Sequence, residues 1–222
     1  MLILVFSGCI KRGDNIATFN DEPAIYDYYS FFRPAIETRF GETLLAPELE
    51  NESFIGGELL WVDFEINYDK QPYSDALTAT ILAYQQIYST YVTTGKADET
   101  AEDGYDAPIA SLLDIKNIEK MLFFWFGHKA PQKQTFGYKM FYDPDDTSSI
   151  PTLYIKAQKT NEETGTGIDL KTCYGFDLSS FLNRYEGSEE VKINIKYCTG
   201  SKDGVDEYRS IDNPITWVFK VD

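Results

Sequence analysis

The sequence predicts an all-β protein built from two modules with an acidic stretch between them. Its 222 residues include 16 Tyr and 15 Phe, and β-branched residues accompany these aromatics in short runs. Aromatic and β-branched residues are the types that strands favour. Long helices do not alternate with strands along the chain, which argues against a doubly wound α/β sheet.

The N-terminal half contains four candidate strands with glycine turns between them. Gly41 and the pair Gly56-Gly57 supply those turns. The region Ala79–Tyr88 could instead form a helix. The four expected strands are Ile25–Phe32, Ile36–Leu45, Glu58–Tyr68 and Leu77–Tyr84.

The C-terminal half shows the clearest period of two, which places one strand face on a core and the other in water. Met121–Phe126 is continuously apolar and predicts a strand buried on both faces, or a short helix. A short helix should be capped by Asp177 or Ser179 and end at Gly187. The alternating strands are Phe136–Tyr142, Leu153–Ala157, Val191–Tyr197 and Ile215–Phe219, the last of which carries Trp217.

Residues 94–108 are polar and acidic, and they mark the expected boundary between the modules. We predict a first domain over residues 16–93, an acidic linker over 94–108 and a second domain over 109–222. A long exposed loop within one domain is the alternative interpretation of the acidic stretch.

Cys9 closes the run Leu4-Val5-Phe6-Ser7-Gly8, and this pattern resembles the lipobox of bacterial lipoproteins. The resemblance implies that residues 1–8 are the remainder of a signal peptide, that Cys9 carries the lipid and that residues 9–15 form a tether. Attachment to the membrane would then be through lipid, on an outer-membrane protein facing either the surface or the periplasm. A buried first strand with a core cysteine is the alternative.

The net charge of −16 argues against a nucleic-acid partner, because so acidic a surface repels phosphate backbones. Cys173 and Cys198 could pair in an exported protein, or they could be two small buried thiols. With one histidine and no CxxC spacing, the sequence offers no zinc-type ligand set.

The small number of candidate catalytic residues and motifs favours a protein that is not an enzyme. The motifs GxSxG, HExxH, GxGxxG and the P-loop are absent, and no cofactor is expected. His128 follows an apolar run and is expected in a surface turn. Asp143, Asp145 and Asp146 could ligate calcium, although a solvated turn fits Pro and Asp better.

Aromatic side chains are the remaining candidates for ligand binding. Trp61 and Trp125 lie in expected strands and are weak candidates, because tryptophan in a strand usually packs into a core. The run Tyr26-Asp27-Tyr28-Tyr29-Ser30-Phe31-Phe32 places aromatic residues on both faces of a strand. Aromatic rings exposed in this way bind sugar rings.

Two longer stretches resemble the NigD-like and related small lipoproteins of Bacteroidetes. The first is Gly57–Pro72, preceded by Thr38–Glu42 and Ala46-Pro47; the second is the helix Phe176–Tyr185 followed by Val191–Thr199. The resemblance implies an N-terminal OB-like barrel and a C-terminal β-sandwich, with no catalytic residues to carry over.

The sequence therefore predicts a non-enzymatic, lipid-anchored protein of the cell envelope. One alternative is a glycan- or peptide-binding accessory lipoprotein of a nutrient-uptake locus, with a protein or glycan partner. The other alternative is a fimbrial subunit, which would need a groove that accepts a donor strand.

Overall fold

The computed structural model describes residues 15–97 and 104–219, so Cys9 and most of the predicted tether lie outside the described residues. The chain divides into two compact units. The first unit comprises Met1–Tyr88 with Lys116–Glu119, and the second comprises Ser89–Ile115 with Lys120–Asp222. Both units are built from strands, which confirms the all-β prediction.

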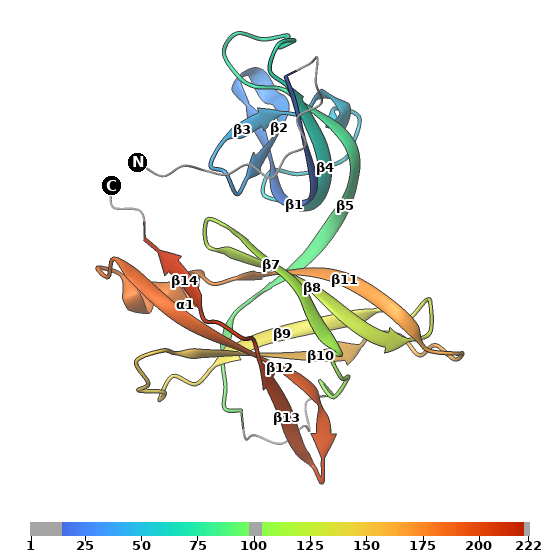
Figure 1. The fold of residues 1–222 in the computed structure, drawn as a ribbon, viewed down its shortest axis with the longest axis vertical. Coiled ribbons are helices and arrows are strands. Elements are labelled where there is room, and N and C mark those ends of the chain that lie inside the picture. The colour runs from blue at the N-terminus through green and yellow to red at the C-terminus, as the bar shows by residue number, and fades with distance from the viewer. Residues whose placement is uncertain (1–14, 98–103, 220–222) are drawn as a thin grey trace. The chain divides into compact units, whose positions relative to one another are not determined.

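The first unit is a curled antiparallel sheet with the strand order β3-β2-β1-β4-β5 (Figure 1). Leu45 at the end of β3 pairs with Thr78, and its N–H donates to the carbonyl of Leu77 at 2.9 Å, which brings the two edges of the sheet together. This OB-like unit consists of β1 (Ile16–Tyr29), β2 (Arg33–Thr38), β3 (Thr43–Leu45), β4 (Leu59–Asn67) and β5 (Ala79–Tyr91).

The curl of this sheet follows from irregularities in strand pairing. The register between β1 and β4 shifts between Phe19 and Glu22, where Asp21 has φ of 53°. A second shift between Asp63 and Phe64 interrupts the β4–β5 ladder. Such bulges bend a strand and increase its twist. The enclosed core includes Tyr26, Ile36, Leu44, Leu49, Leu60, Val62 and Phe64.

Two sequence expectations for this unit were wrong in detail. Ile36–Leu45 is two strands, because the chain turns at Gly41 with φ of 75°. Of the two alternatives for residues 79–88, the strand is correct and the helix is not: the region belongs to β5, which pairs with β4 along most of its length. The first strand begins at Ile16 rather than at Ile25, because the polar bulge around Asp21 interrupts its apolar alternation.

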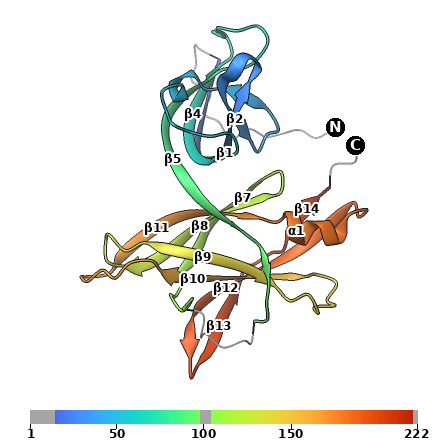
Figure 2. The same cartoon turned by 180° about the vertical axis from the view of Figure 1, so that it is seen from behind.

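The second unit is a β-sandwich of two sheets (Figures 1 and 2). In one sheet β11, β8 and β7 follow β5 in the strand order, and the other sheet has the order β13-β12-β10-β9-β6, with β14 also paired to β12. The strands are β6 (Thr93–Thr94), β7 (Ser111–Ile118), β8 (Met121–Ala130), β9 (Phe136–Tyr142), β10 (Thr152–Lys159), β11 (Ile168–Asp177), β12 (Glu190–Lys202), β13 (Val205–Ser210) and β14 (Ile215–Val218).

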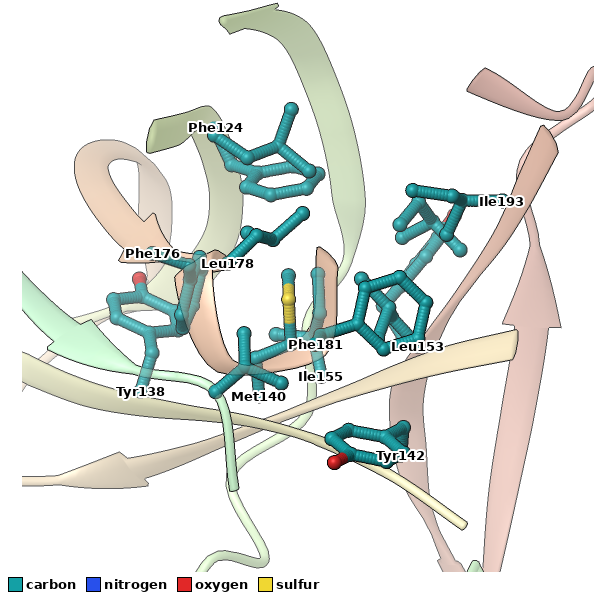
Figure 3. Packing of buried hydrophobic residues seen from close by; sticks show 14 of the residues in the cluster. Phe124, Tyr138, Met140, Tyr142, Leu153, Ile155, Phe176, Leu178, Phe181 and Ile193 are labelled. Carbon is teal, nitrogen blue, oxygen red and sulfur yellow. The ribbon is translucent and has the colours of Figure 1, made fainter. Parts of the chain in front are cut away.

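The sandwich core contains the inward side chains of the alternating strands. Met140, Leu153 and Ile155 point toward Phe181, which comes from the short helix α1 (Ser179–Leu182) (Figure 3). The carboxylate of Asp177 accepts the N–H of Ser179 at 2.7 Å and so satisfies a backbone donor at the start of this helix. The alternation of apolar and polar residues in the sequence therefore correctly predicted which strand faces are buried in this core.

The division between the units does not coincide with the predicted linker. The chain passes from the first unit to the second within β5, between Tyr88 and Ser89. Thr93 and Thr94 already pair with β9, and Ala107 pairs with Ala157 in β10. Both ends of the acidic stretch are therefore paired with strands of the second unit, although the composition of the stretch resembles that of a linker.

Candidate binding surface

A row of aromatic rings lies on the first unit and reaches the solvent. The ring centroids of Phe32 and Tyr28 are 6.3 Å apart, those of Tyr28 and Tyr26 are 5.3 Å apart, and Tyr26 lies 5.3 Å from Phe54. Phe54 in turn lies 5.6 Å from Tyr84. Tyr26 is buried, whereas Tyr28, Phe32 and Tyr84 are exposed. We call Tyr28, Phe32, Phe54 and Tyr84 the aromatic surface.

The aromatic surface is anchored by the strand that carries it. Tyr26 points into the core from β1, and burial, with a hydrogen bond to Tyr28, raises the pKa of Tyr26 to about 12. The hydroxyl of Tyr28 donates to the carbonyl of Phe54 at 3.2 Å. A hydrogen bond with Glu52 raises the pKa of Tyr84. The exposed rings are thus positioned by bonds to neighbouring segments.

Phe32 is the most unusual member of this surface. Its side chain is 85% exposed, and its backbone has φ of 58°. The left-handed region costs a bulky residue about 1 kcal/mol or more, because Cβ approaches the backbone closely. A residue that is strained and also exposed contributes little to the core, and such outliers are concentrated at functional sites.

A cavity of about 170 Å³ opens beside Phe32. The cavity combines aromatic and proline surfaces with one guanidinium and one carboxylate. It is smaller than the pockets that enclose whole small-molecule ligands. Its lining residues are Phe32, Arg33, Pro34, Leu45, Pro47, Glu50 and Tyr73.

Arg33 forms a fixed part of the cavity wall. Its guanidinium carbon lies 5.2 Å from the ring centroid of Tyr29 and 4.8 Å from that of Tyr73. Nη2 donates to Asp75 at 2.7 Å, and Nε donates to the carbonyl of Ser30 at 3.2 Å. The hydrogen bond from Arg33 lowers the pKa of Asp75. The charge of Arg33 is therefore balanced by a carboxylate of the same chain.

The segment that carries the aromatic surface is strongly acidic. Residues 16–88 contain 13 Asp and Glu against 3 Lys and Arg, a formal net charge of −10 out of the −16 of the whole chain. Arg33 pairs with Asp75, and Arg39 pairs with Glu22 at 2.8 Å. The surface therefore presents aromatic rings in a field of negative charge.

The tryptophans singled out in the sequence do not contribute to this surface. Trp61 is buried in β4, and its indole N–H donates to Asp21 at 3.2 Å. Trp125 is half-buried on β8, in the second unit. The informative signal was instead the aromatic run at residues 26–32, whose last residue cannot continue the strand.

The three acidic candidates for calcium follow β9 in one loop. The N–H of Asp145 donates to a carboxylate oxygen of Asp143 at 2.9 Å, and the N–H of Ser148 donates to Asp146 at 2.9 Å. This bond to Ser148 lowers the pKa of Asp146. Within residues 15–97 and 104–219, no group of three or more acidic, His or Cys side chains could hold a metal ion.

The two cysteines that could have formed a disulfide lie inside the sandwich unit. Cys173 on β11 and Cys198 on β12 are buried thiols on strands of different sheets. The Sγ–H of Cys198 donates to the carbonyl of Gly200 at 3.3 Å.

His128 was expected in a surface turn, and this expectation was wrong. It is buried because β8 continues to Ala130. Nδ1 lies 3.0 Å from the carbonyl of Pro108, which can only accept, so in the neutral ring Nδ1 carries the hydrogen. Nε2 then accepts the hydroxyl of Tyr138 at 2.7 Å. Burial lowers the pKa of His128 to about 4, so the ring is neutral at pH 7.

One buried ion pair was not predicted at all. Lys156 on β10 and Asp206 on β13 lie 2.7 Å apart, and their side chains are 2% and 1% exposed. Ser201 also donates to Asp206 at 2.6 Å. Sequence pattern could not find this pair, because Lys156 occupies a polar position of an alternating strand that ordinarily faces water. The attraction within a buried pair of this kind is largely offset by the cost of removing both charges from water.

No family model matches this chain, and no curated protein matches it. Solved structures do match. An uncharacterized protein from Parabacteroides merdae has a TM-score of 0.74 at 16% identity, over 90% of this chain and 99% of that one. A putative lipoprotein from Bacteroides fragilis has a TM-score of 0.61 at 13% identity, over 93% and 98% of the two chains.

A NigD-like immunity protein from Bacteroides caccae also matches, with a TM-score of 0.58 at 12% identity, over 90% of this chain and 93% of that one. In the described part of the chain no helix is long and apolar enough to cross a membrane. At these identities the likeness concerns the fold. The chain has the all-β fold of these Bacteroides and Parabacteroides proteins, the NigD-like protein among them, as the sequence resemblance predicted.

Proposed function

We propose that this chain is a non-enzymatic, lipid-anchored protein of the bacterial cell envelope that acts by binding a partner through the aromatic surface. The observation that carries the proposal is Phe32, which is strained, 85% exposed and next to a cavity. Large exposed apolar groups in a cluster mark interaction sites in soluble domains. The left-handed backbone of Phe32 closes the three-residue loop of the β1–β2 hairpin, in which Tyr29 pairs with Arg33. That turn does not require a large aromatic side chain in solvent.

A binding role also agrees with the side chains of the described residues. His128 is buried with both ring nitrogens hydrogen-bonded, and Asp206 is enclosed in an ion pair. Neither group lines the cavity beside Phe32. The side chains that do line it position and attract a ligand, and they include no pairing of a nucleophile with a base.

Attachment by lipid is supported by Cys9 and by the fold. Cys9 follows small residues at the end of an apolar run, and one protein with the same fold is described as a putative lipoprotein. Another is described as an immunity protein. A single lipid chain binds membranes only marginally, so a lasting anchor at Cys9 would need more than one chain or a second membrane signal.

Lipid attachment is tested by metabolic labelling of cells that express the full-length protein. We expect labelled palmitate to be incorporated into the wild type and not into Cys9→Ser, because only the thiol can accept the lipid. Cys198→Ser serves as the control and should keep the label, since Cys198 is buried. Equal labelling of the wild type and Cys9→Ser would contradict anchoring at Cys9.

A further inference from the structure

We propose that the aromatic surface binds a cationic protein segment and that the cavity beside Phe32 receives a Lys or Arg side chain of that segment. This inference rests on the proposed function, which assigns binding to the aromatic surface, and it adds the chemistry of the partner.

The first argument is charge complementarity. The segment 16–88 carries a formal net charge of −10, and its two arginines, Arg33 and Arg39, already pair with Asp75 and Glu22 of the same chain. The acidic excess is thus left for an external partner. Complementary charge speeds the encounter of two proteins and rejects partners of the wrong sign.

The second argument is the chemistry of the cavity. Rings of Phe32 and Tyr73 and the carboxylate of Glu50 line it together. A cation gains energy over an aromatic ring, and a carboxylate beside the ring adds an ion pair. The charge of Arg33 in the wall is balanced by Asp75, which lies 2.7 Å away and is not part of the lining. Glu50 is the carboxylate that the lining itself presents.

The third argument is that this region already holds one guanidinium in the same manner. Arg33 lies 5.2 Å from the ring centroid of Tyr29 and 4.8 Å from that of Tyr73, and it donates to a carboxylate. An arginine from a partner would meet the same combination at Phe32 and Glu50. A neutral glycan could use the ring of Phe32, but it would gain nothing from the charge of −10.

The proposal is tested with synthetic peptides on the full chain carrying Cys9→Ser. Amide shifts in NMR spectra and dissociation constants are measured with hexa-arginine, hexa-glutamate and maltohexaose. We expect hexa-arginine to shift the amides of Phe32, Glu50 and Tyr73. We also expect Phe32→Gly and Glu50→Gln each to weaken its binding about tenfold, as loss of one cation–π or ion-pair contact would.

Two matched controls separate this site from general attraction to an acidic protein. Glu189→Gln removes the same charge from an exposed position of the second unit, and Tyr91→Ala removes a 71% exposed ring. Both should bind hexa-arginine within about twofold of the wild type, because general attraction depends on net charge alone.

The inference is overturned if Phe32→Gly binds hexa-arginine as tightly as the wild type, because the peptide would then be held by charge alone. It is also overturned if maltohexaose shifts these amides and hexa-arginine does not. In that case the aromatic surface would remain a binding surface, and only the class of partner would change. If no probe shifts these amides, both this inference and the binding role lose their support.

Discussion

Trp217→Ala is expected to lower the free energy of unfolding of the second unit by about 3–5 kcal/mol, as truncation of large core side chains does. Trp217 is 6% exposed on β14, opposite Val191 of β12, and belongs to the sandwich core. Removing the indole loses its buried apolar contacts and leaves a cavity in the core. Urea denaturation, followed by circular dichroism, measures the change.

The matched control is Val218→Ala on the same strand. Val218 is 66% exposed, so its truncation should change the free energy of unfolding by no more than about 0.5 kcal/mol. If Trp217→Ala unfolds at the same urea concentration as the wild type, Trp217 is not a core residue and the boundary of the sandwich must be redrawn.

His128 should make the protein lose stability in acid. Its folded pKa is about 4, below the ordinary value of 6.5, because burial disfavours the charged ring. The unfolded chain therefore binds more protons between these values. The contribution of His128 is complete above pH 6.5 and is lost as the pH falls through 4. Between pH 7.5 and 4.5 the loss amounts to about 2–3 kcal/mol.

Comparison with His128→Gln isolates this effect from the many carboxylates. Glutamine does not titrate, and its amide can both donate to the carbonyl of Pro108 and accept from Tyr138. The difference in unfolding free energy between the wild type and His128→Gln should shift by about 2–3 kcal/mol, in favour of the variant, as the pH is lowered from 7.5 to 4.5. A difference that does not change with pH would show that His128 is not buried as a neutral ring.

Much of the second unit was predictable from the sequence, because strands such as β9 and β12 have one face in the core. The alternation at Phe136–Tyr142 and Val191–Tyr197 identified both the strands and their buried faces. Asp177 accepts the N–H of Ser179 at the start of the helix, but the N-cap is Leu178 and the α-helix ends at Leu182 rather than at Gly187. Local patterns of this kind depend only on neighbours in sequence.

The first unit was harder to predict, because bulges and exposure break the local pattern. β5 has exposed side chains along most of its length, so it shows no period of two. The pair Lys156–Asp206 and the cavity beside Phe32 join segments that are distant in sequence. The left-handed backbone of Phe32 could not be predicted from the sequence either, since glycine and asparagine are the usual residues in that conformation.

The central claim is that Phe32 is held on the surface for binding and not for folding, and the unfolding free energy of Phe32→Gly tests it most directly. Glycine relieves the left-handed strain at φ of 58° and removes a ring that is 85% exposed. The account predicts a free energy of unfolding that is unchanged or higher by up to about 1 kcal/mol. A loss of more than about 1 kcal/mol would show that the ring supports the fold, and it would contradict the claim.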